Sequence, residues 1–292
     1  VWMHKRTAGY PIGGSLKFAR QVEKRYLELG GRINYKSKVT KISVKNDCAT
    51  GIVLDNGEEH TSDVVVSAAD GYSTIFNMLG GRYMDAKVKD YYDNYETFPS
   101  YLMVSFGVAR TFENGPSTVM LVLEQPLIID KGPKCEQVMV RIFSFDPTLA
   151  PEGKTVITVM IATKELDYWD NLKRTDPEQY QAEKDRIAGE VLEVLKKRFG
   201  DTGSKVEMTD VSTPSTFMRY TNNWKGSFEG WLWTPRVGFR SLRKTLPGLG
   251  DFYMAGHWVE PGGGLPAVLM SGRNVAQIIC KKDKKKFTTS GF

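Results

Sequence analysis

The sequence has few of the residues that hold metals or form disulfides. Its 292 residues include only three histidines and three cysteines, Cys48, Cys135 and Cys280, with no Cys-x-x-Cys spacing. A zinc ribbon is therefore unsupported. An odd number of cysteines without a secretory signal favours a reducing compartment, so we expect a cytoplasmic protein.

Several other signatures are also absent. The apolar runs fall short of the ~20 residues that a membrane-spanning helix needs, which predicts a soluble protein with at most peripheral membrane contact. No nucleophile elbow, P-loop or His-Glu-x-x-His motif occurs, so nothing indicates a hydrolase or an NTPase.

The net charge of +6 is concentrated near the end of the chain. Residues 281–286 carry five lysines and one aspartate, which leaves +2 for the rest. A nearly neutral body argues against nucleic acid as a partner. The tail is either a solvated terminus or a contact with an anionic membrane surface, worth roughly 1 kcal/mol per basic residue. Its lysines are Lys281, Lys282, Lys284, Lys285 and Lys286.

The first part of the chain predicts a helix followed by strands. Apolar residues recur at helical spacing after Ser15, a candidate N-cap, until Gly30-Gly31. Strands are expected at 32–35, 39–44 and 48–54, with turns at Asn46-Asp47 and Asp55-Asn56-Gly57, and the nearly continuous apolar run 63–69 predicts a strand buried on both faces.

The middle of the chain has a different character. Segments 101–108, 119–123, 138–143 and 155–162 are rich in β-branched and aromatic residues and predict strands. A long helix is expected over 178–199, with Asp176 as its N-cap and an apolar stripe at Ile187, Val191, Val194 and Leu195. Several strands against one long helix indicate an α+β arrangement.

The final part resembles the first. A short strand at 252–255 and a loop at 256–260 precede Pro261-Gly262-Gly263-Gly264, and a helix is expected over 265–279. Because terminal segments of similar character flank a distinct middle, we expect one domain built from both ends of the chain and a second inserted between them.

The glycine-rich loop before this last helix carries the strongest local signal. Glycines allow a backbone to approach a ligand closely, and a helix N-terminus favours an anion or the electron-rich edge of a reduced ring cofactor. The alternative is a plain strand-to-helix turn. Gly262-x-Gly264-x-x-Ala267 formally matches the dinucleotide pattern, but no second strand with an acidic residue follows it, and no other G-x-G-x-x-G occurs.

Two further features have open interpretations. His257 is either a general acid or base or, as we favour, a packed or cofactor-orienting side chain. The segment 213–233 is crowded with aromatic residues and indicates either an apolar ligand pocket or an aromatic core. Stacking on nucleic-acid bases is disfavoured by the near-neutral body.

Together these segments resemble a known family. Ordered motifs along nearly the whole chain are similar to the C-terminal part of the phytoene desaturase/carotenoid isomerase-like FAD-dependent oxidoreductases, a branch of the amine-oxidase-type flavoproteins. The motifs are Tyr10-Pro11-Ile12-Gly13-Gly14-Ser15, Leu29-Gly30-Gly31-Arg32-Ile33, Val39-Thr40-Lys41-Ile42, Ala49-Thr50-Gly51-Ile52, Leu54-Asp55-Asn56-Gly57, Val66-Ser67-Ala68-Ala69-Asp70, Thr213-Pro214, Arg219-Tyr220-Thr221, Gly226-Ser227-Phe228-Glu229-Gly230-Trp231, Leu246-Pro247-Gly248-Leu249, Ala255-Gly256-His257-Trp258, Pro261-Gly262-Gly263-Gly264-Leu265-Pro266 and Ser271-Gly272-Arg273.

This resemblance implies roles for individual residues. The backbone of Val39 would contact the FAD adenine, and Ala68 and Ala69 would lie near the same end of the cofactor. Gly256 and His257 would approach its ribityl and pyrophosphate region. The residues expected to face the isoalloxazine are Gly263, Gly264, Leu265 and Pro266. The candidate substrate-contacting residues are Arg219, Tyr220, Trp224, Gly230 and Trp231. The resemblance identifies no catalytic base.

The implied fold class is α/β with α+β. We expect an incomplete FAD-binding domain, a Rossmann-like remnant with a β-hairpin, from residues 1–85 and 247–292, and an inserted mixed sheet-and-helix substrate domain from 86–246. The family's N-terminal G-x-G-x-x-G is absent, so the chain is expected to be a piece of a longer protein whose N-terminal region completes the cofactor site.

The implied function is that of an FAD-dependent oxidoreductase acting on an apolar, unsaturated, isoprenoid substrate. The alternatives are a flavin-dependent double-bond isomerase and a non-catalytic prenyl-lipid escort protein.

Overall fold

A computed structural model describes residues 9–112, 115–238 and 241–289. The chain divides into two compact units. Unit 1 comprises the described residues of Val1–Tyr35 and Tyr101–Ser215, and unit 2 those of Lys36–Ser100 and Thr216–Phe292. The chain therefore alternates between the units, and each unit is built from two separate segments.

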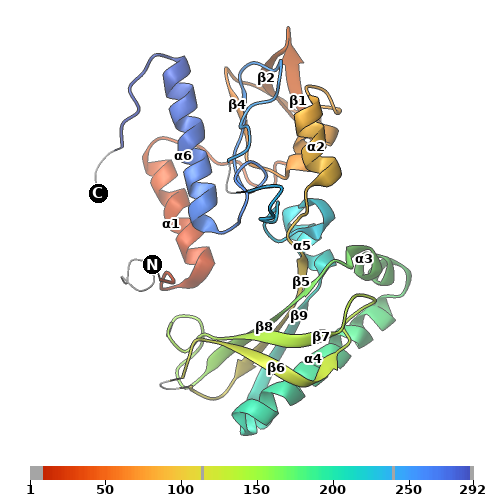
Figure 1. Cartoon of the computed structure of the whole chain (residues 1–292). Coiled ribbons are helices and arrows are strands. Elements are labelled where there is room, and N and C mark those ends of the chain that lie inside the picture. The colour runs from red at the N-terminus through yellow and green to blue at the C-terminus, as the bar shows by residue number, and fades with distance from the viewer. Residues whose placement is uncertain (1–8, 113–114, 239–240, 290–292) are drawn as a thin grey trace. The chain divides into compact units, whose positions relative to one another are not determined.

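Unit 1 is built on a five-stranded sheet with the strand order β6-β7-β8-β5-β9. The helix α4 (Pro177–Phe199) runs along one face of this sheet (Figure 1). The unit also contains α1 (Gly14–Glu28), α3 (Leu166–Thr175) and the 3-10 helix η2 (Asp201–Lys205). The strands are β5 (Ser100–Val108), β6 (Thr118–Leu127), β7 (Cys135–Ile142), β8 (Thr155–Thr163) and β9 (Val206–Ser212).

The long helix forms for the reasons that its sequence indicates. The Asp176 carboxylate accepts a hydrogen bond from the Gln179 N–H at 2.9 Å, which confirms the predicted N-cap. Ile187, Val191 and Leu195 are fully buried against the sheet, where each contributes about 1.5–3 kcal/mol. Val194, the fourth residue of the predicted stripe, is only half-buried.

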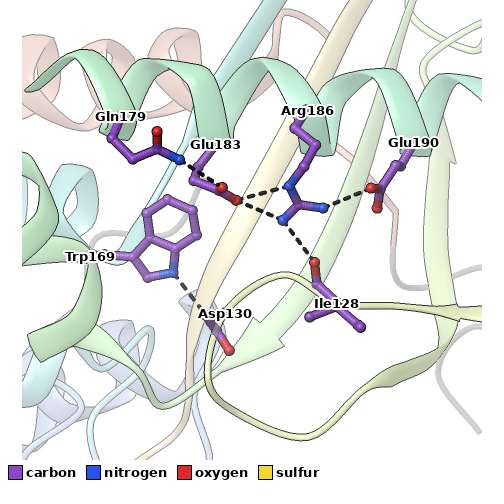
Figure 2. A network of polar contacts seen from close by, with 7 residues as sticks. All are labelled: Ile128, Asp130, Trp169, Gln179, Glu183, Arg186 and Glu190. Atoms are coloured by element: carbon purple, nitrogen blue, oxygen red, sulfur yellow. Dashed lines mark hydrogen bonds and ion pairs between the residues drawn. The ribbon is translucent and has the colours of Figure 1, made fainter.

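A polar network fastens α4 to the segment that follows β6 (Figure 2). The Arg186 guanidinium donates to the Ile128 carbonyl at 3.0 Å and to Glu183 and Glu190 at 2.7 Å. Burial alone would lower the pKa of Arg186, but these carboxylates outweigh it and raise the pKa. The Trp169 indole N–H donates to Asp130 at 3.2 Å and so fixes α3 to the same segment.

Unit 2 contains two small sheets. The antiparallel sheet consists of β1 (Val39–Lys45), β2 (Cys48–Leu54) and β3 (Glu59–Thr61). Asn46 and Asp47 have φ of 48° and 56°, as a two-residue type I′ hairpin turn requires. The second sheet is the parallel pair of β4 (Val65–Ser67) and β10 (Phe252–Met254).

Helices of different lengths complete unit 2. The chain passes into it through α5 (Pro214–Thr221). The helix α6 (Leu265–Lys282) starts after the glycine-rich loop and is three residues longer than predicted. The others are the π-helix η1 (Ser73–Met78), α2 (Ala86–Asn94) and the 3-10 helix η3 (Trp224–Gly226).

Some sequence-based predictions were wrong. Residues 32–35 form no strand. The predicted strand 63–69 is shortened to Val65–Ser67, and Val66 is 46% exposed, so this strand is buried on one face only. Gly13, not Ser15, occupies the N-cap position of α1 and has a left-handed backbone.

The two compact units divide the chain at other positions than the predicted domain ranges, which stay a prediction. Residues 9–35 pack in unit 1 with the middle of the chain, and residues 86–100, 216–238 and 241–246 pack in unit 2. The assignment of one part of the chain to cofactor and another to substrate stays a prediction.

Candidate functional site

The parallel pair in unit 2 brings two predicted cofactor segments to one sheet edge. The register pairs Val65, Val66 and Ser67 with Phe252, Tyr253 and Met254, and the Ala255 N–H donates to the Ser67 carbonyl at 2.9 Å. Because the strands are parallel, the segments that follow them, 68–69 and 256–257, emerge side by side. In α/β folds ligands bind at the carboxyl ends of parallel strands. Ala68 and Ala69 are exposed there, although Ser67 is buried.

Asp70 organises the chain just beyond this edge. The residue is only 5% exposed, and its carboxylate accepts hydrogen bonds from the Ser73 N–H at 2.7 Å and the Trp224 N–H at 2.8 Å. Burial raises the pKa of Asp70, whereas the two N–H donors act to lower it. The side chain thereby joins the start of η1 to a segment more than 150 residues further along the chain.

The backbone conformation at position 256 favours glycine, and there is open space beside this residue. Its φ is +102°, and a Cβ placed there would find only the Ala68 carbonyl within 4 Å, at 3.9 Å. The Gly256 N–H donates to the Ser271 hydroxyl of α6 at 2.8 Å, which ties the strand end to the helix. This glycine therefore leaves room beside a fixed backbone.

His257 lies next to this opening. Its Nε2 is buried and has no hydrogen-bond partner among the described residues. Gly230, one of the predicted substrate-contacting residues, packs on the His257 backbone, since a Cβ at Gly230 would lie 3.2 Å from the His257 carbonyl carbon. The absence of a carboxylate partner agrees with a packed or orienting role better than with a general base.

The glycine-rich loop itself is in contact with side chains of unit 2. Gly262, Gly263 and Gly264 all have positive φ, of 106°, 71° and 82°. A Cβ at Gly262 would collide with the Trp233 ring, and one at Gly263 with the Glu229 carboxylate. Glu229 also accepts the Gly264 N–H at 3.0 Å and so supplies the acceptor that the start of α6 otherwise lacks.

These contacts explain the glycines of the loop without any ligand. The loop is a tight turn in which Glu229 caps the start of α6. Contact of Gly263 and Gly264 with the flavin stays a prediction. Leu265 and Pro266 are exposed at the first turn of α6.

The aromatic segment forms part of a core. Trp231 is fully buried, its indole N–H donates to the Trp258 carbonyl at 3.1 Å, and the two rings lie 4.9 Å apart at 83°. Trp224 is half-buried and stacks on Tyr72 at 5.1 Å. For Trp231 these contacts favour the aromatic-core interpretation over a ligand pocket.

The remaining predicted residues are Arg219, Tyr220 and Val39. Arg219 and Tyr220 are exposed on α5, where the guanidinium lies 4.6 Å from the ring centroid. Val39 starts β1 and pairs with Leu54, at the hairpin end opposite the turn at Asn46-Asp47. The parallel strand pair therefore brings together Ala68, Ala69, Gly256 and His257, but not Val39.

Other kinds of site find no support in the part of the chain that the structure describes. No group of three or more His, Cys, Asp or Glu side chains there could hold a metal ion. Within the same ranges, none of the helices combines the length and apolar character that crossing a bilayer requires. Lys281 and Lys282 lie in the last turn of α6, and Lys282 pairs with Asp251.

The strand-end site fits a dinucleotide cofactor in two respects. Gly256 leaves an open cradle that a Cβ would narrow, and the buried Nε2 of His257 lacks a partner. Sequence reasoning missed Asp70, Ser271 and Glu229 as organising residues. The signal for Glu229 was its place within a glycine-rich motif, but only the fold shows that it reaches Gly264.

Comparisons with known proteins agree with the resemblance. Residues 3–280 match the family described as flavin containing amine oxidoreductase. The chain is 26% identical over 276 residues to a chloroplastic prolycopene isomerase of Arabidopsis thaliana, covering 92% of this chain and 45% of the relative. It is 28% identical over 292 residues to a neurosporene-forming phytoene desaturase of Cereibacter sphaeroides, covering 92% and 53%.

A solved structure shows the same fold. An oxidoreductase from Methanosarcina mazei superposes with a TM-score of 0.59 at 18% identity, over 91% of this chain and 55% of that one. The chain thus spans about half the length of the curated relatives that it matches. Since the family match covers nearly the whole sequence, the chain belongs to the flavin-containing amine oxidoreductase family.

Proposed function

We propose that this chain forms part of an FAD-dependent oxidoreductase that acts on an apolar, unsaturated, isoprenoid substrate. The observation that carries the proposal is the meeting of Ala68-Ala69 and Gly256-His257 at the carboxyl edge of a parallel strand pair. This is where α/β folds bind ligands. The substrate class rests on the relatives, which are named as carotenoid desaturases and isomerases.

The chain's own residues would hold and orient the cofactor. Open space at Gly256 would let the backbone approach FAD closely. The unpartnered His257 Nε2 would find a polar partner on the cofactor. Ser271 and Asp70 would keep the two strand ends in place through their hydrogen bonds to backbone N–H groups. Bound FAD supplies hydride transfer chemistry, which these side chains do not provide.

The segment that completes the cofactor site would come from outside the 292 residues. No G-x-G-x-x-G is followed by the strand that a dinucleotide fingerprint needs. We propose the N-terminal region of the same protein as this partner. We also propose that the lysines of 281–286 make a peripheral contact with an anionic membrane, from which an apolar substrate would be taken.

Redox-neutral isomerisation of a double bond is the second candidate. It is favoured by the prolycopene isomerases among the relatives, which cover 90–92% of this chain, close to the 92% covered by the desaturase of Cereibacter sphaeroides. In that reaction the flavin would be bound in its reduced form, and substrate and product would have the same composition.

The test is an anaerobic titration of the longer, FAD-loaded protein with an acyclic polyene hydrocarbon. Desaturation predicts bleaching of the flavin absorbance by the substrate, and a fully saturated chain of equal length serves as the control. No bleaching, together with conversion of cis to trans isomers on pre-reduced flavin, would favour the isomerase. Failure of the longer protein to take up FAD would contradict both reactions and would favour a non-catalytic prenyl-lipid carrier.

A further inference from the structure

Five of the eleven methionines of the chain lie on one face of the unit 1 sheet. Side chains alternate along a strand, and the core residues Val104, Val140 and Val159 point toward α4. In β5, β6, β7 and β8 each methionine is next to a residue in or packed against the core cluster, so its side chain lies on the face opposite α4. In β9, Met208 is directly opposite Gly107, which lies between the core residues Phe106 and Val108, so Met208 is on that face too. They are Met103, Met120, Met139, Met160 and Met208.

Three of these methionines form a row across neighbouring strands. Met120 is directly opposite Met139, and Met139 is directly opposite Met160. Directly opposed residues have Cβ atoms about 4.5–5.5 Å apart, so the row extends for roughly 10 Å across β6, β7 and β8. Met120 is 55% exposed and Met208 71% exposed. The hydrophobic core on the α4 side therefore does not account for these side chains.

A polar row runs beside the methionine row on the same face. Arg141 is paired with Thr118 on one side and with Thr158 on the other. These residues are two positions from the methionines in their strands, which is about 7 Å. The face therefore combines an apolar strip with a parallel strip that has a cation at its centre.

Arg141 has an unused donor. Its Nε is buried without a hydrogen-bond partner, and its guanidinium lies 5.3 Å from the Tyr10 ring centroid. Among the described residues, no carboxylate forms an ion pair with it. A buried unsatisfied donor costs about 1–3 kcal/mol, more when charged. An acceptor from a ligand would remove this cost.

We propose that this face binds a linear, unsaturated apolar chain that ends in an anionic acceptor group. The chain would lie along Met120, Met139 and Met160, and the end group would accept hydrogen bonds from Arg141. Thioethers are polarisable and adaptable and make favourable contacts with π systems, so they suit a conjugated chain. The charge of Arg141 complements an anion. The proposal rests on the proposed function, and within its class of apolar, unsaturated substrates it specifies those that carry an acidic end group.

The probe is cis-parinaric acid, a conjugated tetraene carboxylic acid whose fluorescence rises in apolar surroundings. It is titrated into the 292-residue chain without FAD, beside its methyl ester and with stearic acid as a saturated competitor. We expect saturable binding of the acid, about tenfold tighter than the ester, and weak competition by stearic acid.

Variants test whether the acidic end of the ligand binds at the polar row and its apolar chain at the methionine row. Arg141→Met should abolish the preference for acid over ester, whereas Arg141→Lys should keep most of it. The double variant Met120→Gln/Met139→Gln should weaken acid and ester alike, about tenfold. Met270→Gln changes an exposed methionine of α6 and should leave binding unchanged. Circular dichroism of each variant confirms that the sheet is intact.

Three results would overturn the proposal: no saturable binding by a folded chain, equal affinity for acid and ester, or an unchanged acid preference in folded Arg141→Met. Stearic acid that competes with an affinity equal to that of cis-parinaric acid would contradict the preference for an unsaturated chain. Since FAD is absent from the assay, a failure here differs from a failure of the proposed function, which is measured by flavin uptake and bleaching.

Discussion

Asp70 shows how much one residue contributes to the candidate site. Its two carboxylate oxygens accept from different N–H donors, those of Ser73 and Trp224. In Asp70→Asn the amide nitrogen would face one of these donors, so one hydrogen bond is lost and two N–H groups oppose each other. We expect a loss of about 1–3 kcal/mol in the free energy of unfolding, measured by urea denaturation. A loss below about 0.5 kcal/mol would show that Asp70 does not hold the two segments together.

At this scale the sequence predicted residue types better than contacts. The hairpin turn at Asn46-Asp47 and the N-cap at Asp176 were correct, because both depend on neighbours within a few positions. The bond from Glu229 to Gly264 and the bond from Asp70 to Trp224 join residues distant in sequence. No local sequence pattern encodes such pairs. Trp231 was predicted to contact substrate because the residue type alone does not show whether a tryptophan is buried in the core.

At the scale of elements, α2 depends on a charged cap. Asp85 accepts the Val88 N–H at 2.8 Å and pairs with Arg243 at 2.5 Å. The hydrogen bond from the Val88 backbone, with the help of Arg243, lowers the pKa of Asp85. Because the pKa is lowered on folding, ionised Asp85 stabilises the fold at pH values above its unfolded-state pKa of about 3.9. This stabilisation is lost as the pH falls through the folded-state pKa.

We therefore expect Asp85→Ser to be less stable than the wild type at pH 7 and to differ less from it at pH 3. Serine keeps a cap acceptor but loses the charge, so the difference at pH 7 should not exceed about 1 kcal/mol. Urea denaturation at the two pH values measures it. A difference that stays constant with pH would contradict a role for the charge of Asp85.

The elements themselves were predicted unevenly for physical reasons. The strands of unit 1 and α4 have strong periodicity and long apolar faces, so their positions were nearly correct. The run 63–69 looked like a buried central strand, but its partner β10 is only three residues long and limits the pairing to Val65–Ser67. Short helices such as α2 and α5 lack enough turns to show a periodic pattern and were missed.

At the scale of the whole molecule, the chain is two units built from alternating segments. The sequence predicted a single insertion because its two ends look alike. It could not show that residues 9–35 pack with the middle, because α1 has no buried residue. The packing of α1 in unit 1 depends instead on loop contacts such as the hydrogen bond from the Gly13 N–H to Asp146 at 2.7 Å. The family match and the coverage of about half of each relative are consistent with a cofactor site shared with another segment.

The central claim is that FAD binds at the carboxyl edge of β4 and β10, and Gly256 tests it most directly. Gly256→Ala adds a methyl group beside open space at φ +102°, and Gly57→Ala adds one at φ +86° in a hairpin turn with nothing within 4 Å. Both substitutions carry similar backbone strain. A substitution in the glycine-rich loop, such as Gly263→Val, is a less informative test of FAD binding. Its side chain would displace Glu229 whether or not a cofactor binds there.

The measurement is the FAD dissociation constant of the longer protein, by flavin fluorescence, for wild type, Gly256→Ala and Gly57→Ala. We predict at least a tenfold weaker affinity for Gly256→Ala and an unchanged affinity for Gly57→Ala. Equal affinities in all three folded proteins would contradict the placement of the cofactor at this edge.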